Sequence, residues 1–399
     1  MSTQTGLKPI LRAAPQPIDL TVNKPSPDAL QQARTLFEQG VREAESGQLS
    51  RAESCFSQAL ELVPERPSVL MNLGVVRAAL GRTTEAIDLL RRAAELEPEA
   101  AETWAHLGAS YAETGQYPLA LAALDRTLAL HPQDSIALQH KASVLRELGR
   151  WDESAQCLQR LHQQGGGDEF TRYMLAAVQH AQSDWTQEPP APPAGYVAQL
   201  FDRYADDFSS HLSQLDYRAP DILVKAAKGS LSQSWEQVLD LGCGTGLVGQ
   251  CLQGLALHID GVDLSASMVS KAQESGHYRR VWQADIHDAM EQAHQAGHRY
   301  DLIVSADVFI YVGALERMFE LATRVLRAGG GLTFSLEEWA AGPQAYVLRP
   351  SLRYAHSLAY IQRLASDHGL RVLRTDRGLL RHDHGQAITG LFCVLQKNG

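Results

Sequence analysis

Small and apolar positions in the first half of the chain recur every 34 residues. The recurring positions are glycine at 40, 74 and 108 with alanine at 142, glycine at 47, 81, 115 and 149, alanine at 52, 86 and 120, a bulky residue at 56, 90 and 124, and proline at 64, 98 and 132. Small residues let two helices approach closely, glycine ends a helix, and proline closes the next one. The pattern therefore predicts helical hairpins over 33–66, 67–100, 101–134 and 135–168, with a capping helix over 168–183.

The second half alternates short apolar runs with stretches of helical spacing. This alternation predicts a mostly parallel sheet with helices on both faces. The expected strands cover 237–241, 258–262, 280–284, 302–306, 331–336, 371–375 and 388–396. No helix separates the last two, so we expect them to form an antiparallel hairpin at one edge of a seven-stranded sheet.

A proline-rich segment, 187–195, separates the two patterns and favours an extended spacer. The sequence thus predicts four parts: a flexible tail over 1–27, a helical repeat domain over 28–183, a linker over 184–195 and an α/β domain over 196–399.

Composition narrows the function. The chain has 399 residues, 44% of them hydrophobic, and a formal net charge of -10. No apolar run approaches the ~20 residues needed to span a bilayer, and an acidic chain is a poor match for nucleic acid as its main partner. The five cysteines form no CxxC pair, so neither a disulfide nor a metal site is implied. We expect a cytoplasmic protein that does not span a membrane.

The expected strand 237–241 ends in a glycine-rich turn. Gly242, Cys243, Gly244, Thr245 and Gly246 follow the strand directly and lead into a helix. Such a turn brings backbone N–H groups close to a ligand, and a side chain there would keep the ligand away. The spacing of Gly244, Gly246 and Gly249 also fits a dinucleotide-binding turn, which leaves NAD as an alternative. Asp240, two residues before Gly242, favours a different cofactor.

Two resemblances give these patterns names. The third repeat resembles the tetratricopeptide repeat consensus at Trp104, Leu107, Gly108, Tyr111, Ala120 and Pro132. The turn after Asp240 resembles motif I of class I methyltransferases, and the whole chain is similar to predicted methyltransferases that carry tetratricopeptide repeats. The second resemblance implies a Rossmann-like α/β fold and S-adenosylmethionine as the cofactor.

The repeats imply a concave groove for a protein or peptide partner. The first-helix positions expected to line the groove are Phe37, Val41, Met71, Val75, Ala105, Ala109, Gln139 and Ser143. Self-association, including a homo-oligomer, and a role as a rigid spacer are the alternatives for the repeats.

The methyltransferase resemblance also implies residues that contact the cofactor. Asp263 and Leu264 follow the second expected strand, where the acid takes the ribose hydroxyls, and Asp285 and Ile286 follow the third, where the family contacts the adenine. Each aspartate taken alone is equally consistent with a helix N-cap. Met268 is expected to cover the other face of the adenine. Tyr204 belongs to a segment, 201–208, that resembles a lid over the cofactor, and the alternative is an amphipathic helix packed on the sheet.

Methyl transfer needs alignment of the reacting atoms, and it needs a base only when the acceptor starts protonated. Asp307 and Tyr311 follow the fourth expected strand and are the first candidates beside the methyl group. His356 is a candidate base with Tyr354 as its orienting partner, and the alternative is a surface histidine at a helix start. No metal is required. The leading hypothesis is methylation of a protein or peptide recruited by the repeats; the alternatives are methylation of a small metabolite and a cofactor-binding scaffold without turnover.

Overall fold

The computed structural model describes residues 25–165, 167–180, 189–193, 195–204, 217–383 and 386–399. The chain divides into two compact units, residues 1–178 and 179–399. Tyr204 belongs to a described helix, but its side chain lies outside the described part, as does most of the expected lid segment.

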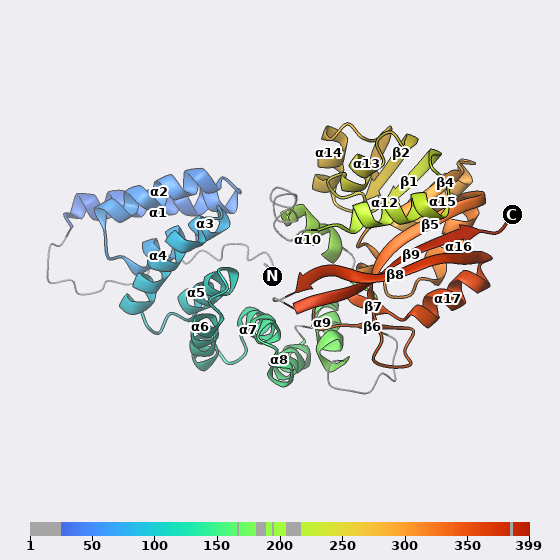
Figure 1. The fold of residues 1–399 in the computed structure, drawn as a ribbon. Helices are drawn as coiled ribbons and strands as arrows, with labels where there is room; N and C mark the ends of the chain where they lie inside the picture. The colour runs from blue at the N-terminus through green and yellow to red at the C-terminus, as the bar shows by residue number, and fades with distance from the viewer. Residues whose placement is uncertain (1–24, 166, 181–188, 194, 205–216, 384–385) are drawn as a thin grey trace. The chain divides into compact units, whose positions relative to one another are not determined.

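The first unit is a series of antiparallel helix pairs (Figure 1). Its helices are α1 (Pro27–Glu45), α2 (Leu49–Leu62), α3 (Pro67–Ala79), α4 (Thr83–Leu96), α5 (Ala101–Glu113), α6 (Tyr117–Leu130), α7 (Ser135–Glu147), α8 (Trp151–Gln163) and α9 (Glu169–His180). The predicted helical hairpins and the final helix are confirmed.

The repeat glycines mark close helix contacts. A Cβ atom added at Gly74 in α3 would lie 2.8 Å from Cγ of Leu90 in α4, and one at Gly108 would lie 2.7 Å from Cγ of Leu124. The period of 34 therefore pairs each glycine with the bulky residue that packs on it. In the last pair Ala142 replaces the glycine, and the Ser154 hydroxyl donates a hydrogen bond of 2.8 Å to its carbonyl.

Three positions expected to line the groove lie in the core of the repeats instead. Phe37, Met71 and Val75 are buried among the helices of the first pairs, so this expectation was wrong for them. Ala109 and Gln139 are partly exposed, as a groove position requires. Among the described residues no helix is both long and apolar enough to cross a bilayer.

The second unit is built on one mixed sheet (Figure 1). Five parallel strands, β1 (Trp235–Leu241), β2 (Ala256–Asp263), β3 (Arg280–Gln283), β4 (Tyr300–Ser305) and β5 (Leu326–Glu338), lie in the order β3-β2-β1-β4-β5. The hairpin of β8 (Leu370–Asp383) and β9 (Gln386–Lys397) pairs antiparallel with β5 through β9. The predicted fold class and terminal hairpin are confirmed.

Two short strands were not predicted. β6 (Tyr346–Leu348) and β7 (Tyr354–His356) form an antiparallel pair inserted after β5, and β7 pairs with Glu337 and Glu338 at the end of β5. The sheet therefore has nine strands among the described residues. Strands of three residues are too short for an alternating pattern to show in the sequence.

Helices cover both faces of the sheet. The helices of this unit are α10 (Tyr196–Tyr204), α12 (Ala219–Ser230), α13 (Leu247–Cys251), α14 (Ala266–Glu274), α15 (Ile286–Gln295), α16 (Glu316–Val325) and α17 (Leu358–Asp367). One core packs α15, α16 and α17 on the sheet, and a second packs α12 and α13 on its other face. This arrangement leaves the carboxyl ends of the parallel strands at one edge, where such folds bind ligands.

Candidate active site

The turn between β1 and α13 needs its glycines. Gly242, Gly244 and Gly246 have φ values of 71, 53 and 97°, a region that other residues rarely adopt. A Cβ atom on Gly242 would lie 2.2 Å from Cγ2 of Val308. The glycine thus lets the turn approach the segment that follows β4. Cys243 is buried in this turn, and burial raises the pKa of its thiol.

Asp240, at the end of β1, is a buried carboxyl group with one oxygen lacking a partner. The Tyr278 hydroxyl donates a hydrogen bond of 2.6 Å to Oδ2, whereas Oδ1 has no hydrogen-bond partner among the described residues. Burial raises the pKa of Asp240 to about 7, against the lowering effect of the Tyr278 hydrogen bond. A buried carboxyl group with an unused oxygen suits a cationic ligand group.

Tyr278 was missed from the sequence, although a signal for it exists. A Cβ atom on Gly249 would lie 2.6 Å from Cζ of Tyr278, and one on Gly261 would lie 2.9 Å from its Cδ1. The Gly249 amide also donates to the Tyr278 hydroxyl at 3.1 Å. The third glycine of the motif therefore makes room for the tyrosine that holds Asp240.

Asp263 connects the end of β2 to the glycine turn. Its Oδ2 accepts the Gly244 amide at 2.9 Å, and its Oδ1 accepts the Ser265 amide at 2.9 Å. The N-cap of α14 is Ser265, so Asp263 is not the capping residue. Burial raises the pKa of Asp263. The adjoining Leu264 is partly exposed.

Helix α10 reaches the same strand end through Asp202. The Ser265 hydroxyl donates a hydrogen bond of 2.5 Å to Asp202 Oδ1, and this bond lowers the pKa of Asp202. The structure thus brings part of the segment expected to form a lid to the end of β2, beside Asp263.

The residues expected to bind adenine lie around the start of α15. Asp285 caps this helix and accepts hydrogen bonds from the backbone amide and Nδ1 of His287 at 2.8 and 2.9 Å. The hydrogen bond to the His287 side chain lowers the pKa of Asp285. Ile286 is buried, and the Met268 side chain has no exposed surface. The N-cap alternative is therefore correct for Asp285, and its contact with adenine stays a prediction.

Asp307 follows β4 in a left-handed backbone conformation, with φ of 59°. Its Oδ1 accepts the Ser335 hydroxyl at 2.8 Å, and its amide donates to the same oxygen at 2.9 Å. Burial raises the pKa of Asp307, and the positive charges of Arg381 and Arg353 oppose that shift. The backbone strain and the charged neighbours are typical of a functional position.

Tyr217 was also missed as a site residue. It lies near both Asp307 and Asp240, whose negative charges add to burial in raising the pKa of its hydroxyl, and it forms a hydrogen bond with Asp307. This tyrosine therefore links the glycine turn to the position expected to face the acceptor.

Tyr311 lies in a short 3-10 helix, Phe309–Tyr311, just after Asp307. The Arg353 guanidinium donates from Nε to the Tyr311 hydroxyl at 3.5 Å. The ring of Phe201 in α10 meets the Tyr311 ring edge to face, with centroids 5.4 Å apart. The structure thus brings Asp307, Tyr311 and Arg353 together at the carboxyl end of β4.

His356 is not a surface histidine, so that alternative was wrong. It has no exposed surface, its ring stacks on Tyr360, and its Nε2 is 2.8 Å from the Gly313 carbonyl oxygen. Burial lowers the pKa of His356 to about 4. The buried Tyr354 hydroxyl donates to the Pro190 carbonyl oxygen. These contacts place both residues behind the segment after Tyr311, where they support it instead of facing an acceptor.

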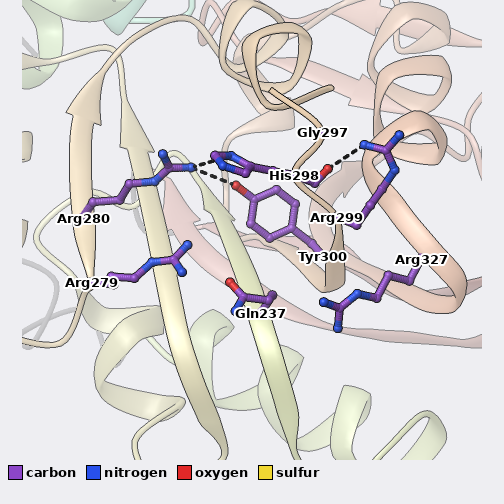
Figure 2. Close-up of a pocket in the computed structure, with 8 residues that line it drawn as sticks. All are labelled: Gln237, Arg279, Arg280, Gly297, His298, Arg299, Tyr300 and Arg327. Atoms are coloured by element: carbon purple, nitrogen blue, oxygen red, sulfur yellow. Dashed lines mark hydrogen bonds between the residues drawn. The ribbon is translucent and has the colours of Figure 1, made fainter. Parts of the chain in front are cut away.

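The opposite edge of the sheet holds a pocket of about 650 Å³ (Figure 2). It is lined by Gln237, Arg279, Arg280, Gly297, His298, Arg299, Tyr300 and Arg327. Figure 2 shows Arg279 and Arg280 on one side of Tyr300 and Arg299 and Arg327 on the other. These residues stand at the beginnings of the strands, far along β1 and β4 from Asp240 and Asp307.

Family models match both halves of the chain. Residues 238–330 match a model described as a methyltransferase domain, and residues 31–101 and 77–141 match two tetratricopeptide repeat models. The first match begins in β1 and ends in β5, so it includes the glycine turn, Asp263 and Asp307.

Curated relatives match parts of the chain. The malonyl-[acyl-carrier protein] O-methyltransferase of Salmonella typhimurium is 28% identical over 202 residues, which are 49% of this chain and 73% of that protein. The mitochondrial ubiquinone biosynthesis O-methyltransferase of Mus musculus is 26% identical over 38% of this chain and 41% of its own length. Among solved structures, the N-methyltransferase NodS of Bradyrhizobium japonicum in complex with S-adenosyl-L-homocysteine covers 51% of this chain and 98% of its own, at 17% identity and a TM-score of 0.41.

Proposed function

This chain joins tetratricopeptide repeats to an S-adenosylmethionine-dependent methyltransferase domain, and we propose that it methylates a protein or peptide that the repeats recruit. The observation that carries the proposal is the arrangement of Asp240, Asp263 and the glycine turn at one strand edge. Repeats of this kind present extended surfaces to partner proteins. The acceptor and the partner are the parts of the proposal that go beyond the domain assignment.

The residues at this edge fit the cofactor. The unused Oδ1 of Asp240 suits the ammonium group of the methionine moiety, and the glycine turn leaves room for that moiety at its backbone. Asp263 stands at the end of β2, where its carboxylate can exchange the Ser265 or Gly244 amide for ribose hydroxyls. Asp285 and Ile286 are the proposed contacts to adenine.

When bound, the cofactor supplies an activated methyl group on a sulfonium. The chain's own contribution is to orient the acceptor and to exclude water. Asp307 is held by Ser335 and Tyr217, so its carboxyl group has a fixed position from which to hold an acceptor proton or a positive charge that develops on the acceptor. Tyr311 stands between Phe201 and Arg353, where its hydroxyl orients the acceptor. We assign His356 and Tyr354 to positioning, because neither reaches the site.

A small acceptor is the second candidate. The printed names of the two curated relatives specify O-methylation, one of malonyl-[acyl-carrier protein] and one in ubiquinone biosynthesis. In this case the repeats would serve assembly and the catalytic unit would bind the metabolite alone. Deleting the repeats would then leave methylation of the acceptor unchanged.

The test is calorimetric titration of S-adenosylmethionine, and separately of NAD, into the full chain and two variants. We expect saturable binding of S-adenosylmethionine, no binding of NAD, and a loss of at least about tenfold in affinity for Asp263→Ala. Glu274→Ala on the exposed side of α14 is the matched control and should bind like the wild type. Binding of NAD alone, or equal affinity in Asp263→Ala, would refute the cofactor assignment.

The partner is tested with the same full chain on a column. Protein that binds to it is incubated with S-adenosylmethionine carrying a labelled methyl group, and transfer of label to a retained polypeptide supports the proposal. Label that appears only in small molecules favours the second candidate.

A further inference from the structure

Three arginines gather at the carboxyl end of β5, beside the proposed acceptor position. Glu337, the buried residue near the end of this strand, forms an ion pair of 2.6 Å with Arg349 and a second ion pair with Arg381. Arg349 and Arg353 belong to the β6–β7 insertion, and Arg381 belongs to β8. We call Arg349, Arg353 and Arg381 the arginine cluster.

Arg381 is the least satisfied member of the arginine cluster. Its Nη2 binds Glu337, but Nε and Nη1 are fully buried and have no hydrogen-bond partner among the described residues. Its side chain is 11% exposed. A buried donor without a partner costs about 1–3 kcal/mol, and native proteins retain few such groups without a functional reason.

The arginine cluster adjoins the catalytic candidates. Arg353 donates to the Tyr311 hydroxyl, and the charges of Arg353 and Arg381 both act on Asp307. A ligand group held by the arginine cluster would therefore lie next to Asp307 and Tyr311. These two residues follow β4, at the edge of the sheet where the cofactor turn approaches Val308.

The charges in this region do not balance among the described residues. The three guanidinium groups of the arginine cluster face two carboxyl groups, Glu337 and Asp307. The adjacent Glu338 already pairs with Arg377, which lies on the exposed side of β8. One positive charge is left over, so one singly charged anion would complete the set.

We propose that the acceptor carries a carboxylate group that binds to Arg381 and Arg353 and thereby places the methylated atom beside Asp307. This inference rests on the proposed function and names the chemical class of its substrate. A carboxylate accepts several N–H bonds in one plane, as a guanidinium donates them, and it carries the single charge that the arginine cluster lacks. A phosphate dianion would overcompensate that charge.

The competing explanation is that the arginine cluster only holds the β6–β7 insertion and β8 onto Glu337. That role needs the bonds to Glu337, and it gives no reason for the two unpaired nitrogens of Arg381. The two explanations differ in what an added anion does to the folded protein.

The experiment uses the full chain saturated with S-adenosyl-L-homocysteine and succinate as the probe. We expect saturable binding of succinate by calorimetry and no binding of succinamide, its neutral diamide. Arg381→Gln should weaken succinate binding at least about tenfold, because a charge-assisted hydrogen bond contributes about 1.5–3 kcal/mol. Arg377→Gln, on the same strand but paired outside the arginine cluster, is the matched control and should bind succinate like the wild type.

Other outcomes overturn the inference. Equal binding of succinate and succinamide, no saturable binding of succinate, or an unchanged affinity in Arg381→Gln each contradicts an anion site in the arginine cluster. Tighter binding of inorganic phosphate than of succinate contradicts the carboxylate. Arg353→Gln provides a second variant if Arg381→Gln does not fold, as judged by thermal unfolding. Binding of S-adenosylmethionine is measured in each variant, so its absence in the wild type would refute the proposed function, whereas its presence without succinate binding refutes this inference alone.

Discussion

The two edges of the central sheet both carry buried charge, but they differ in how completely it is paired. At the edge where the strands begin, Arg279 and Arg280 both bind Asp260, at 2.7 and 3.0 Å. At the edge where the strands end, Asp240 keeps one oxygen and Arg381 keeps two nitrogens without partners among the described residues. Incomplete pairing, more than the number of charges, therefore distinguishes the proposed site.

The pocket in Figure 2 shows why the number of arginines is a poor guide. It lies at the edge where the strands begin and includes Arg327, which binds Asp301 at 2.7 Å and Glu236 at 3.1 Å. Its arginines hold the starts of neighbouring strands together. A hollow lined by satisfied ion pairs offers a ligand little that the protein does not already supply.

The largest effect should come from adding one methyl group to the glycine turn. In Gly242→Ala the new Cβ meets Val308 at 2.2 Å and the backbone keeps an unfavourable φ, so the turn must move. We expect affinity for S-adenosylmethionine to fall by about 100-fold or more, measured by calorimetry.

Gly297→Ala in the pocket of Figure 2 is the matched control. Its φ is 75°, but a Cβ atom there would have nothing within 4 Å. It should cost about 1 kcal/mol of stability and leave the cofactor affinity unchanged. Equal losses of affinity in the two variants would contradict the difference between the edges.

Removing the paired arginines should damage folding instead of function. Asp260 is 1% exposed, so Arg279→Gln combined with Arg280→Gln leaves a buried carboxylate unpaired. We expect a loss of about 2 kcal/mol in the free energy of unfolding, at the low end for buried pairs because both arginines are partly exposed. Urea denaturation measures this loss. Cofactor affinity at low temperature, where the variant is folded, should match the wild type, and a selective loss of affinity would mean that this edge also binds a ligand.

The sequence was sufficient where a single segment specifies the structure. The period of 34 pairs Gly74 with Leu90, and the glycine turn follows directly from the strand that ends at Leu241. It was insufficient where distant segments meet. Tyr278 reaches Asp240 from 38 positions away, and Arg381 reaches Glu337 from 44 positions away. A single sequence contains no signal for such contacts, because packing of the finished sheet creates them.

His356 shows the other limit of the sequence. A histidine after a strand, close to the acceptor side, was a reasonable candidate base, but its burial against Tyr360 depends on the inserted strands β6 and β7. These strands have three residues each and gave no pattern. The sequence therefore identified the right edge of the sheet and could not separate the residues that face the site from those that support it.

The pKa of Asp240 predicts a dependence on pH that should be confined to the edge where the strands end. Below a pH of about 7 its carboxyl group in the folded protein becomes protonated and loses its attraction for the cofactor's ammonium group. Affinity for S-adenosylmethionine should fall by up to about tenfold per pH unit below 7. Asp240→Asn should bind weakly at every pH and lack this slope. A wild-type affinity that does not change between pH 5 and about 7.5 would contradict the role of Asp240.

The same residue should affect stability with the opposite sign. The folded pKa of Asp240, about 7, lies above its usual value of 3.8, so the folded protein without cofactor binds a proton that the unfolded chain releases. The stability due to this group is complete below the unfolded pKa and is lost as the pH rises through the folded pKa. Relative to Asp240→Asn, the wild type should therefore become less stable from about pH 4 to about pH 7. Thermal unfolding without cofactor measures this difference, and parallel curves would refute the shift.

The smallest effect should separate the two roles of Asp285. This residue caps α15 and is also the proposed contact to adenine, so Asp285→Ala should lower stability by about 1 kcal/mol and cofactor affinity by roughly threefold to tenfold. Asp288→Ala, exposed in the first turn of the same helix, removes the same charge without a cap and should change either quantity by no more than a few tenths of a kcal/mol. Calorimetry with S-adenosylmethionine and with its ribosyl fragment lacking adenine locates the lost affinity. If Asp285→Ala loses stability but binds S-adenosylmethionine normally, the carboxylate is only a helix cap, and recognition of adenine must come from the packing of Ile286 and Met268.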